Sequence, residues 1–174
     1  MLPMSLLWPC LLTVVLWLAP LGGGAAISAP AVPTLGTLPG LGDLFAGETP
    51  TLGVKDGALA ACPASPNCVV SQTADDAHYI EPIAYSRDRA AARDLLIKVL
   101  GVVPRTEIVT QTDDYIRVRS TSRLMGFVDD AEFYLPPDES VIHLRSAARL
   151  GESDLGVNRR RLEQIRLALQ DLGI

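Results

Sequence analysis

The side chains that could do chemistry are concentrated between positions 115 and 161, where charged and hydroxyl-bearing residues alternate with apolar ones. Side chains alternate between the two faces of a strand, so residues two apart share one face of the predicted sheet. The face turned away from the core then carries eight charged or titratable residues: Tyr115, Arg117, Arg119, Asp130, Glu132, Tyr134, His143 and Arg145. The simplest hairpin register sets Glu132 between Arg117 and His143. The same register sets Asp130 between Arg119 and Arg145.

This outer face fits two kinds of chemistry. Alternating charges on a solvated antiparallel sheet pair across the strands, and each exposed pair contributes about 0.2–1 kcal/mol. Alternatively, the face is an anion-binding platform, or Glu132 and His143 form an acid/base pair. We favour simple charge pairing, because no third group orients His143 and no neighbouring hydroxyl has the setting of a nucleophile.

The parity of Asp129 places its carboxylate on the opposite, core-facing side of the sheet. A buried carboxylate needs a cationic partner or takes up a proton. Arg149, just beyond the last strand, is the first-choice partner, and Arg161 on the last predicted helix is the second. With its neighbours, Asp129 forms an expected polar ring at one end of the sheet: Ser120, Asp129, Ser146, Arg149, Asp154, Asn158 and Arg161.

Two interpretations of this polar ring are open. We favour a buried ion-pair network that holds the loop from Leu150 to Val157 in place. The functional alternative is a pocket for a small anionic or polar group, aided by the positive end of the following helix.

Cys62 and Cys68 bound a short loop that contains two prolines. If an export segment removes Cys10, two cysteines remain, and an even count in an exported chain favours a disulfide. Such a short loop would stabilise the fold at the low end of about 2–4 kcal/mol. A redox pair, or a metal site with His78, is the alternative, although the spacing is not the two-residue spacing typical of either.

Hydrophobic periodicity predicts the elements that position these residues. A strand is expected over 78–85, and then a helix capped by Ser86 and ended by Gly101 and Pro104. Four strands are expected over 106–112, 115–122, 127–135 and 141–148, with a turn at 136–139 before the last one. A final helix begins between Asp154 and Asn158, with an apolar stripe at Leu162, Ile165, Leu169 and Leu172.

The order strand, helix, four strands, helix predicts an α+β domain. We expect an antiparallel sheet of about five strands with both helices on one face. This order matches the TATA-binding-protein-like and helix-grip architectures. Those architectures host unrelated functions, so the fold alone indicates no activity.

Four segments carry a resemblance to a known family: CPASPNCV at 62–69, HYIEPIAY at 78–85, GFVDDAEFYL at 126–135 and IHLRSAARLGESDLGVNRRRLEQIR at 142–166. The domain resembles the uncharacterised family catalogued as domain of unknown function 1499, found in bacteria, cyanobacteria and plastids. Val70 and Ala148 stand where the family pattern has serine. The family has no assigned activity, so the resemblance implies a fold class and a location rather than a chemistry.

The segment from Met4 to Ala19 is almost wholly apolar, and a Gly/Ala-rich stretch follows it. It resembles an export signal cleaved after Ala26, but no Lys or Arg precedes it. A retained anchor, with membrane contact through residues 4–27, is the alternative. We therefore expect a signal peptide or anchor over 1–26, a Pro/Gly-rich linker over 27–60 and a single α+β domain over 61–174.

The net charge of −5 argues against a nucleic-acid partner, which would require a strongly basic face. The sequence has no nucleophile elbow, metal triad or cofactor loop, so we expect neither a cofactor nor a metal. The leading hypothesis is a non-enzymatic domain, exported to the periplasm or the thylakoid lumen, that binds a small ligand or an envelope protein. The alternatives are a hydrolase that uses Asp129 or Glu132 with His143, and a scaffold of a membrane-associated complex.

Overall fold

The computed structural model describes residues 45–174. The predicted signal peptide or anchor, and the linker up to residue 44, lie outside the described residues. No helix in the described part of the chain is both long and apolar enough to cross a membrane.

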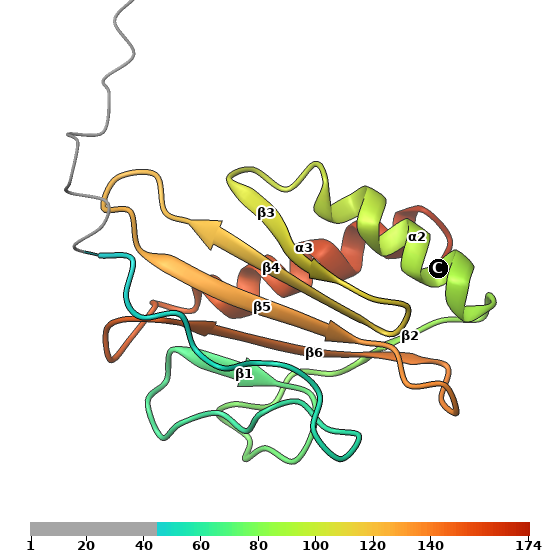
Figure 1. Cartoon of the computed structure of the whole chain (residues 1–174), viewed down its shortest axis with the longest axis horizontal. Helices are drawn as coiled ribbons and strands as arrows, with labels where there is room; N and C mark the ends of the chain where they lie inside the picture. Colours follow the sequence, from blue (N-terminus) through green and yellow to red (C-terminus); the bar gives the residue numbers. More distant parts are fainter. Residues whose placement is uncertain (1–44) are drawn as a thin grey trace, which may run out of the picture. The chain divides into compact units, whose positions relative to one another are not determined.

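One antiparallel sheet of six strands forms the centre of the domain (Figure 1). Its strands are β1 (Cys68–Val70), β2 (Ile83–Ala84), β3 (Thr106–Gln111), β4 (Tyr115–Thr121), β5 (Val128–Tyr134) and β6 (Val141–Ala148). The main order is β1-β6-β5-β4-β3, and β2 also pairs with β6. The predicted α+β class and antiparallel sheet are therefore confirmed.

The sixth strand arises at the N-terminal side of the domain. Strand β1 has only three residues, too few to show a period in the sequence. The strand expected over 78–85 is reduced to Ile83–Ala84, because it contains Pro82, which lacks a backbone N–H. Both short strands pair with β6, β1 through Cys68 opposite Ala147 and β2 through Ile83 opposite Ile142.

Two helices, α2 (Arg89–Leu100) and α3 (Val157–Asp171), pack on one face of the sheet (Figure 1). The N-cap of α2 is Asp88 rather than the expected Ser86, and the Asp88 carboxylate accepts the N–H of Ala91 at 2.9 Å. Leu172 was expected to extend the apolar stripe of α3, but it follows the last turn and is 39% exposed. The buried side chains between helices and sheet form one core: Leu96, Leu162, Ile165 and Leu169 from the helices, and Ile116, Val118, Phe133, Ile142 and Leu144 from the strands.

The register between β4 and β5 is the predicted one, with Arg117 opposite Glu132. The register between β5 and β6 differs by two residues, so Arg145, and not His143, lies opposite Glu132. A residue before proline is held extended, so the chain stays extended through Pro136 and turns one residue later than expected. A shift of two keeps every side chain on its predicted face, although it changes the partners.

The outer face of the sheet is covered around Asp130, Glu132 and Arg145, not solvated as predicted, while the Arg119–Glu107 pair at the β3 side stays exposed. Residues 45–60, here called the strap, run across it (Figure 1). The N–H of Gly53 donates to Oε1 of Glu132 at 2.9 Å, and Leu59 packs with Tyr115 and Tyr134. Phe45 lies edge-on to Phe127, with ring centroids 5.2 Å apart. The sequence predicted these residues as linker, but they help to bury the charged residues around Glu132.

Candidate functional site

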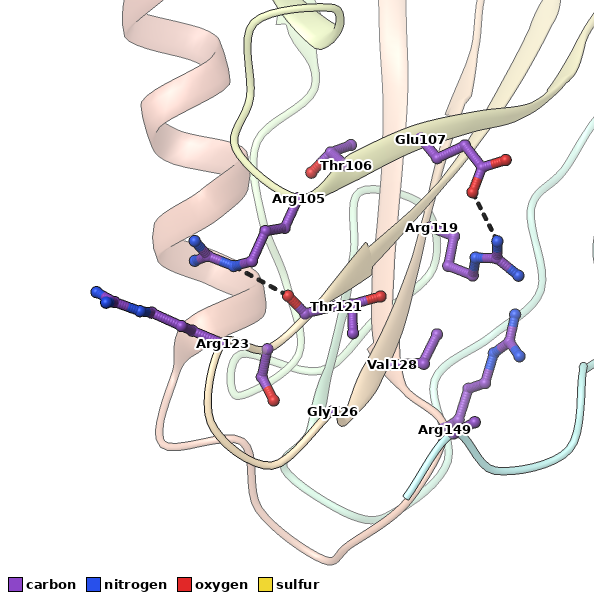
Figure 2. Close-up of a pocket in the computed structure, with 11 residues that line it drawn as sticks. Arg105, Thr106, Glu107, Arg119, Thr121, Arg123, Gly126, Val128 and Arg149 are labelled. Carbon is purple, nitrogen blue, oxygen red and sulfur yellow. Dashed lines mark hydrogen bonds and ion pairs between the residues drawn. The ribbon is translucent and has the colours of Figure 1, made fainter. Parts of the chain in front are cut away.

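A cleft of about 620 Å³ opens where β3 begins and where β4 turns into β5 (Figure 2). Four arginines and a group of small polar residues line most of it. The lining residues are Ala46, Arg105, Thr106, Glu107, Arg119, Thr121, Ser122, Arg123, Gly126, Val128 and Arg149. We call this the arginine cleft.

The backbone around β3 holds one side of the arginine cleft. Arg105 adopts a left-handed conformation (φ 55°), which non-glycine residues rarely take. The N–H of Thr121 donates to the Arg105 carbonyl at 3.0 Å, and Arg105 Nε donates to the Thr121 carbonyl at 3.2 Å. These reciprocal bonds fix the guanidinium of Arg105 beside the end of β4.

On the other side of the cleft, the guanidinium ends of Arg119 and Arg149 face each other, while Arg105 and Arg123 extend away from them (Figure 2). Arg119 donates to Glu107 at 2.6 Å, and this pair is largely exposed. Arg149 is more tightly held, because it donates to both oxygens of Asp130, at 2.6 and 3.2 Å. Arg123 is exposed and makes no ion pair with any residue of the described range 45–174.

The arginine cleft has an excess of positive charge. Four arginines (Arg105, Arg119, Arg123 and Arg149) line the cleft, and a fifth, Arg117, binds Asp130 beside it. Within the described residues, only two carboxylates, Glu107 and Asp130, form ion pairs with any of these five. Burial alone would raise the pKa of Asp130, but hydrogen bonds from Arg149 and Arg117 outweigh it and lower the pKa. Asp130 therefore stays ionised, Arg119 pairs with Glu107, and Arg105 and Arg123 have no carboxylate partner among residues 45–174. Such a site is suited to phosphate or carboxylate groups, which guanidinium binds through paired hydrogen bonds.

The predicted polar ring divides into separate groups. Asp129 lies on the core face as expected, but its partner is Arg161, which donates to Oδ2 at 2.7 Å. The first-choice partner Arg149 was wrong, because its side chain lies on the outer face and binds Asp130. Ser120 also bonds elsewhere, to the Thr106 hydroxyl at 2.7 Å.

Asn158 is the centre of the ring that remains. It bonds the hydroxyl of Ser146, and its Nδ2 donates to Asp154 at 2.8 Å. Asp154 also accepts the backbone N–H of Asn158 at 2.7 Å, so it holds the first turn of α3. A cavity of about 160 Å³ borders Asp129 and Asp154. Because these polar groups bond one another, the geometry supports the ion-pair network more than a ligand pocket.

The negative charge of Asp129 is only partly balanced within this network. Burial raises its pKa, and the hydrogen bond and charge of Arg161 offset that effect only in part. The neighbouring carboxylates Asp154 and Asp130 add to the increase.

The residues around Glu132 on the outer face form a second hydrogen-bonded network. The fully buried Glu132 accepts hydrogen bonds from Tyr115 at 2.8 Å, Gly53 at 2.9 Å and Arg145 at 3.2 Å. Burial raises the pKa of Tyr115, and the adjacent Glu132 raises it further, so the phenol stays protonated and donates. The predicted solvated charge pairing is therefore wrong for Glu132.

His143 makes no hydrogen bond or ion pair with Glu132. Its Nδ1 lies 3.2 Å from the Ser71 hydroxyl, its Nε2 lies 3.5 Å from Glu139, and its ring stacks on Tyr134. Ser71 is buried, and its oxygen also accepts the N–H of Leu144 at 2.8 Å. This serine connects β6 to the residues after β1, in an arrangement that leaves it little room to attack a substrate.

Cys62 and Cys68 form a disulfide, as predicted, with Cα atoms 5.6 Å apart. Both sulfurs are joined in it, so neither thiolate is free to bind a metal. His78, the proposed third ligand, instead bonds the carboxylate of Asp75 at 2.9 Å and the Ser65 carbonyl at 3.2 Å.

Sequence reasoning found Arg119 and Arg149 but missed Arg105, Arg123 and Glu107. The missed residues flank the ends of β3 and β4, which the predicted hairpin brings together. An available signal was the arginine just outside each strand: Arg105 directly precedes β3, and Arg123 lies two residues after β4.

Together, the fold and the site define a class: a disulfide-linked α+β domain with a basic cleft at one end of its sheet. The chain belongs to the family described as "Protein of unknown function (DUF1499)", whose model matches residues 58–169. No curated protein and no solved structure matches the chain.

Proposed function

We propose that this protein is an exported domain that binds a small ligand through a phosphate or carboxylate group in the arginine cleft. The location would be the periplasm or the thylakoid lumen, with residues 1–26 as a signal peptide or membrane anchor. The disulfide is consistent with an oxidising compartment. Because the whole chain has a net charge of −5, the basic cleft is a local feature and not part of a generally basic surface.

One observation carries the proposal: the excess of guanidinium groups around the cleft. Arg123 has no carboxylate partner within residues 45–174, and Arg119 shares only the exposed Glu107. Like charges held close together repel, and a bound anion would relieve that repulsion while accepting several charge-assisted hydrogen bonds. The Thr121 side chain in the same cleft could add a further donor.

The hydrolase alternative receives no support from these contacts. Glu132 and Asp129 are bonded to Arg145 and Arg161, and neither carboxylate reaches His143. Ligand binding without chemistry therefore remains the simpler proposal.

Calorimetric titration of the full-length protein in non-ionic detergent, with inorganic phosphate and with citrate, tests the proposal. We expect saturable binding of at least one anion. Arg119→Gln and Arg123→Gln should each weaken it about tenfold, the effect of losing one charged hydrogen bond. Lys55→Gln is the matched control, because Lys55 is exposed and lies outside the cleft. No binding of either anion, or equal losses in all three variants, would refute the proposal.

A further inference from the structure

Exposed apolar side chains surround the end of the domain that carries the arginine cleft. Most large apolar residues of the domain are buried, yet six at this end are between 37% and 83% exposed: Leu124, Met125, Phe127, Leu150, Leu155 and Val157. Five of them belong to two loops, the turn between β4 and β5 and the segment between β6 and α3, and Val157 is the first residue of α3. We call these six residues the apolar rim.

The apolar rim and the arginine cleft are contiguous. Ser122 borders both the arginine cleft and the smaller cavity that Phe127, Leu150 and Val157 line. Arg105 borders both the arginine cleft and a neighbouring depression next to Val157 and Arg160. Figure 1 shows the β4–β5 turn and the β6–α3 loop at the same end of the sheet. Apolar tips beside basic groups are the pattern of a surface that inserts shallowly into a bilayer and binds its phosphates.

The strap begins at the same end. Phe45, its first residue, packs on Phe127 of the apolar rim, and Ala46 lines the arginine cleft. The 44 preceding residues include the apolar sequence MSLLWPCLLTVVLWLA at 4–19, and no charged residue occurs before Asp43. The described part of the chain therefore begins next to the apolar rim, and 25 residues, 20–44, separate it from the end of the most apolar sequence.

We propose that this end of the domain lies on a membrane, with the apolar rim in the headgroup region and the arginine cleft around the phosphate of an anionic lipid. The proposal rests on the anion binding proposed above and names the class of anion. Charge complementarity favours a bilayer over a protein partner. The cationic cleft matches the anionic lipid phosphates, and the apolar loops match the apolar part of the lipid surface. Bivalent attachment, through residues 4–27 and through the rim, would orient the domain on the membrane.

The test uses the full-length chain with Cys10→Ser and one introduced cysteine that carries an environment-sensitive fluorophore. Leu124→Cys places the probe on the apolar rim, at a side chain that is 83% exposed. Leu167→Cys is the matched control, since Leu167 is 59% exposed on α3 and belongs to neither loop. Each protein is reconstituted into phosphatidylcholine vesicles with or without phosphatidylglycerol, and quenching by nitroxide-labelled lipid reports depth.

We expect the emission of the position-124 probe to shift to the blue and to be quenched only when phosphatidylglycerol is present. The position-167 probe should stay unchanged. Arg105→Gln with Arg123→Gln should abolish the shift, and Lys55→Gln should not. The inference is overturned if the position-124 probe stays in water in both kinds of vesicle. It is also overturned if the emission shift is unchanged when Arg105 and Arg123 are replaced.

The outcomes separate the inference from the proposed function. If phosphate binds saturably in solution but the position-124 probe stays in water, the membrane proposal is refuted. The arginine cleft would then be a site for a soluble anion. Failure of both phosphate and citrate to bind removes the proposed function and, with it, the basis of the inference.

Discussion

Arg161 on α3 donates a hydrogen bond to Asp129 on β5 at 2.7 Å, and this contact joins the last helix to the core face of the sheet. The side chains of Asp129 and Arg161 are 11% and 16% exposed. The adjacent Asp130 points to the opposite face and binds Arg149. Two neighbouring carboxylates thus attach two different segments, α3 and the end of β6, to the same strand.

This arrangement predicts which mutations are coupled. Asp129→Ala and Arg161→Ala should each destabilise the protein, by about 1.5–3 kcal/mol for a hydrogen bond to a charged group. The double mutant should lose clearly less than the sum, since removal of one partner already breaks the bond. Urea unfolding followed by circular dichroism measures all of these free energies.

Asp129→Ala combined with Arg149→Ala is the control for this cycle. Arg149 binds Asp130 on the opposite face, so its loss should add to that of Asp129. Strong coupling between Asp129 and Arg149, without coupling to Arg161, would contradict the observed pairing.

A second prediction compares two glutamates, each paired with an arginine. Glu132→Gln replaces a fully buried carboxylate that accepts three hydrogen bonds, and the new amide would turn a donor toward Arg145. Breaking such a buried pair should reduce the free energy of unfolding by about 3–5 kcal/mol.

Glu107→Gln is the matched change at an exposed pair with Arg119, which should contribute only about 0–1 kcal/mol. Thermal unfolding of both variants measures the difference. Equal, small shifts in melting temperature would mean that the strap does not keep water away from Glu132 in solution.

A third prediction concerns the disulfide. Replacing Cys62 and Cys68 with serine should lower the free energy of unfolding by about 2 kcal/mol, because the closed loop is short. Intact-mass analysis of the protein isolated from its native cells, alkylated without reductant, should show neither Cys62 nor Cys68 modified. Alkylation of both residues would mean that the bond does not form in the native compartment.

The period-two pattern of the strands allowed much of the sheet to be predicted. Side-chain parity correctly assigned Asp129 to the core face and Asp130 and Glu132 to the outer face. A two-residue shift of register leaves each side chain on the same face of the sheet. The predicted faces were therefore right, although the predicted partners between β5 and β6 were wrong. The shift itself depends on where a proline-rich turn bends, which a sequence pattern indicates only approximately.

The strap and the arginine cleft could not be predicted in the same way. Residues 45–60 have no sustained period, and their contacts with Glu132 and Phe127 span 79 residues or more along the chain. The cleft depends on the arginines at the ends of β3 and β4 lying side by side, which tertiary structure decides. Consequently the burial of the outer face, and with it the energetic role of Glu132, was misjudged.

The last prediction uses the opposite pKa shifts of the two neighbouring aspartates. Burial alone would raise the pKa of Asp130, but hydrogen bonds from Arg149 and Arg117 outweigh it and lower the pKa below its ordinary value. Its ionised form therefore stabilises the fold at pH values above the unfolded pKa, and this contribution is lost as the pH falls through the lower folded pKa. The pKa of Asp129 is raised by burial, so ionisation of Asp129 costs stability as the pH rises through that pKa.

Asp130→Asn and Asp129→Asn should accordingly respond to pH in opposite directions. At pH 7, Asp130→Asn should be much less stable than the wild type, and the gap should close below the unfolded pKa of about 3.9 as the wild-type carboxyl takes up a proton. The stability of Asp129→Asn relative to the wild type should instead be lowest at low pH and should increase as the pH rises. Urea unfolding of the three proteins between pH 3 and pH 7 checks both trends. Parallel curves for the two variants would show that the arginines around Asp130 do not hold it ionised, and the charge balance assigned to the arginine cleft would then be wrong.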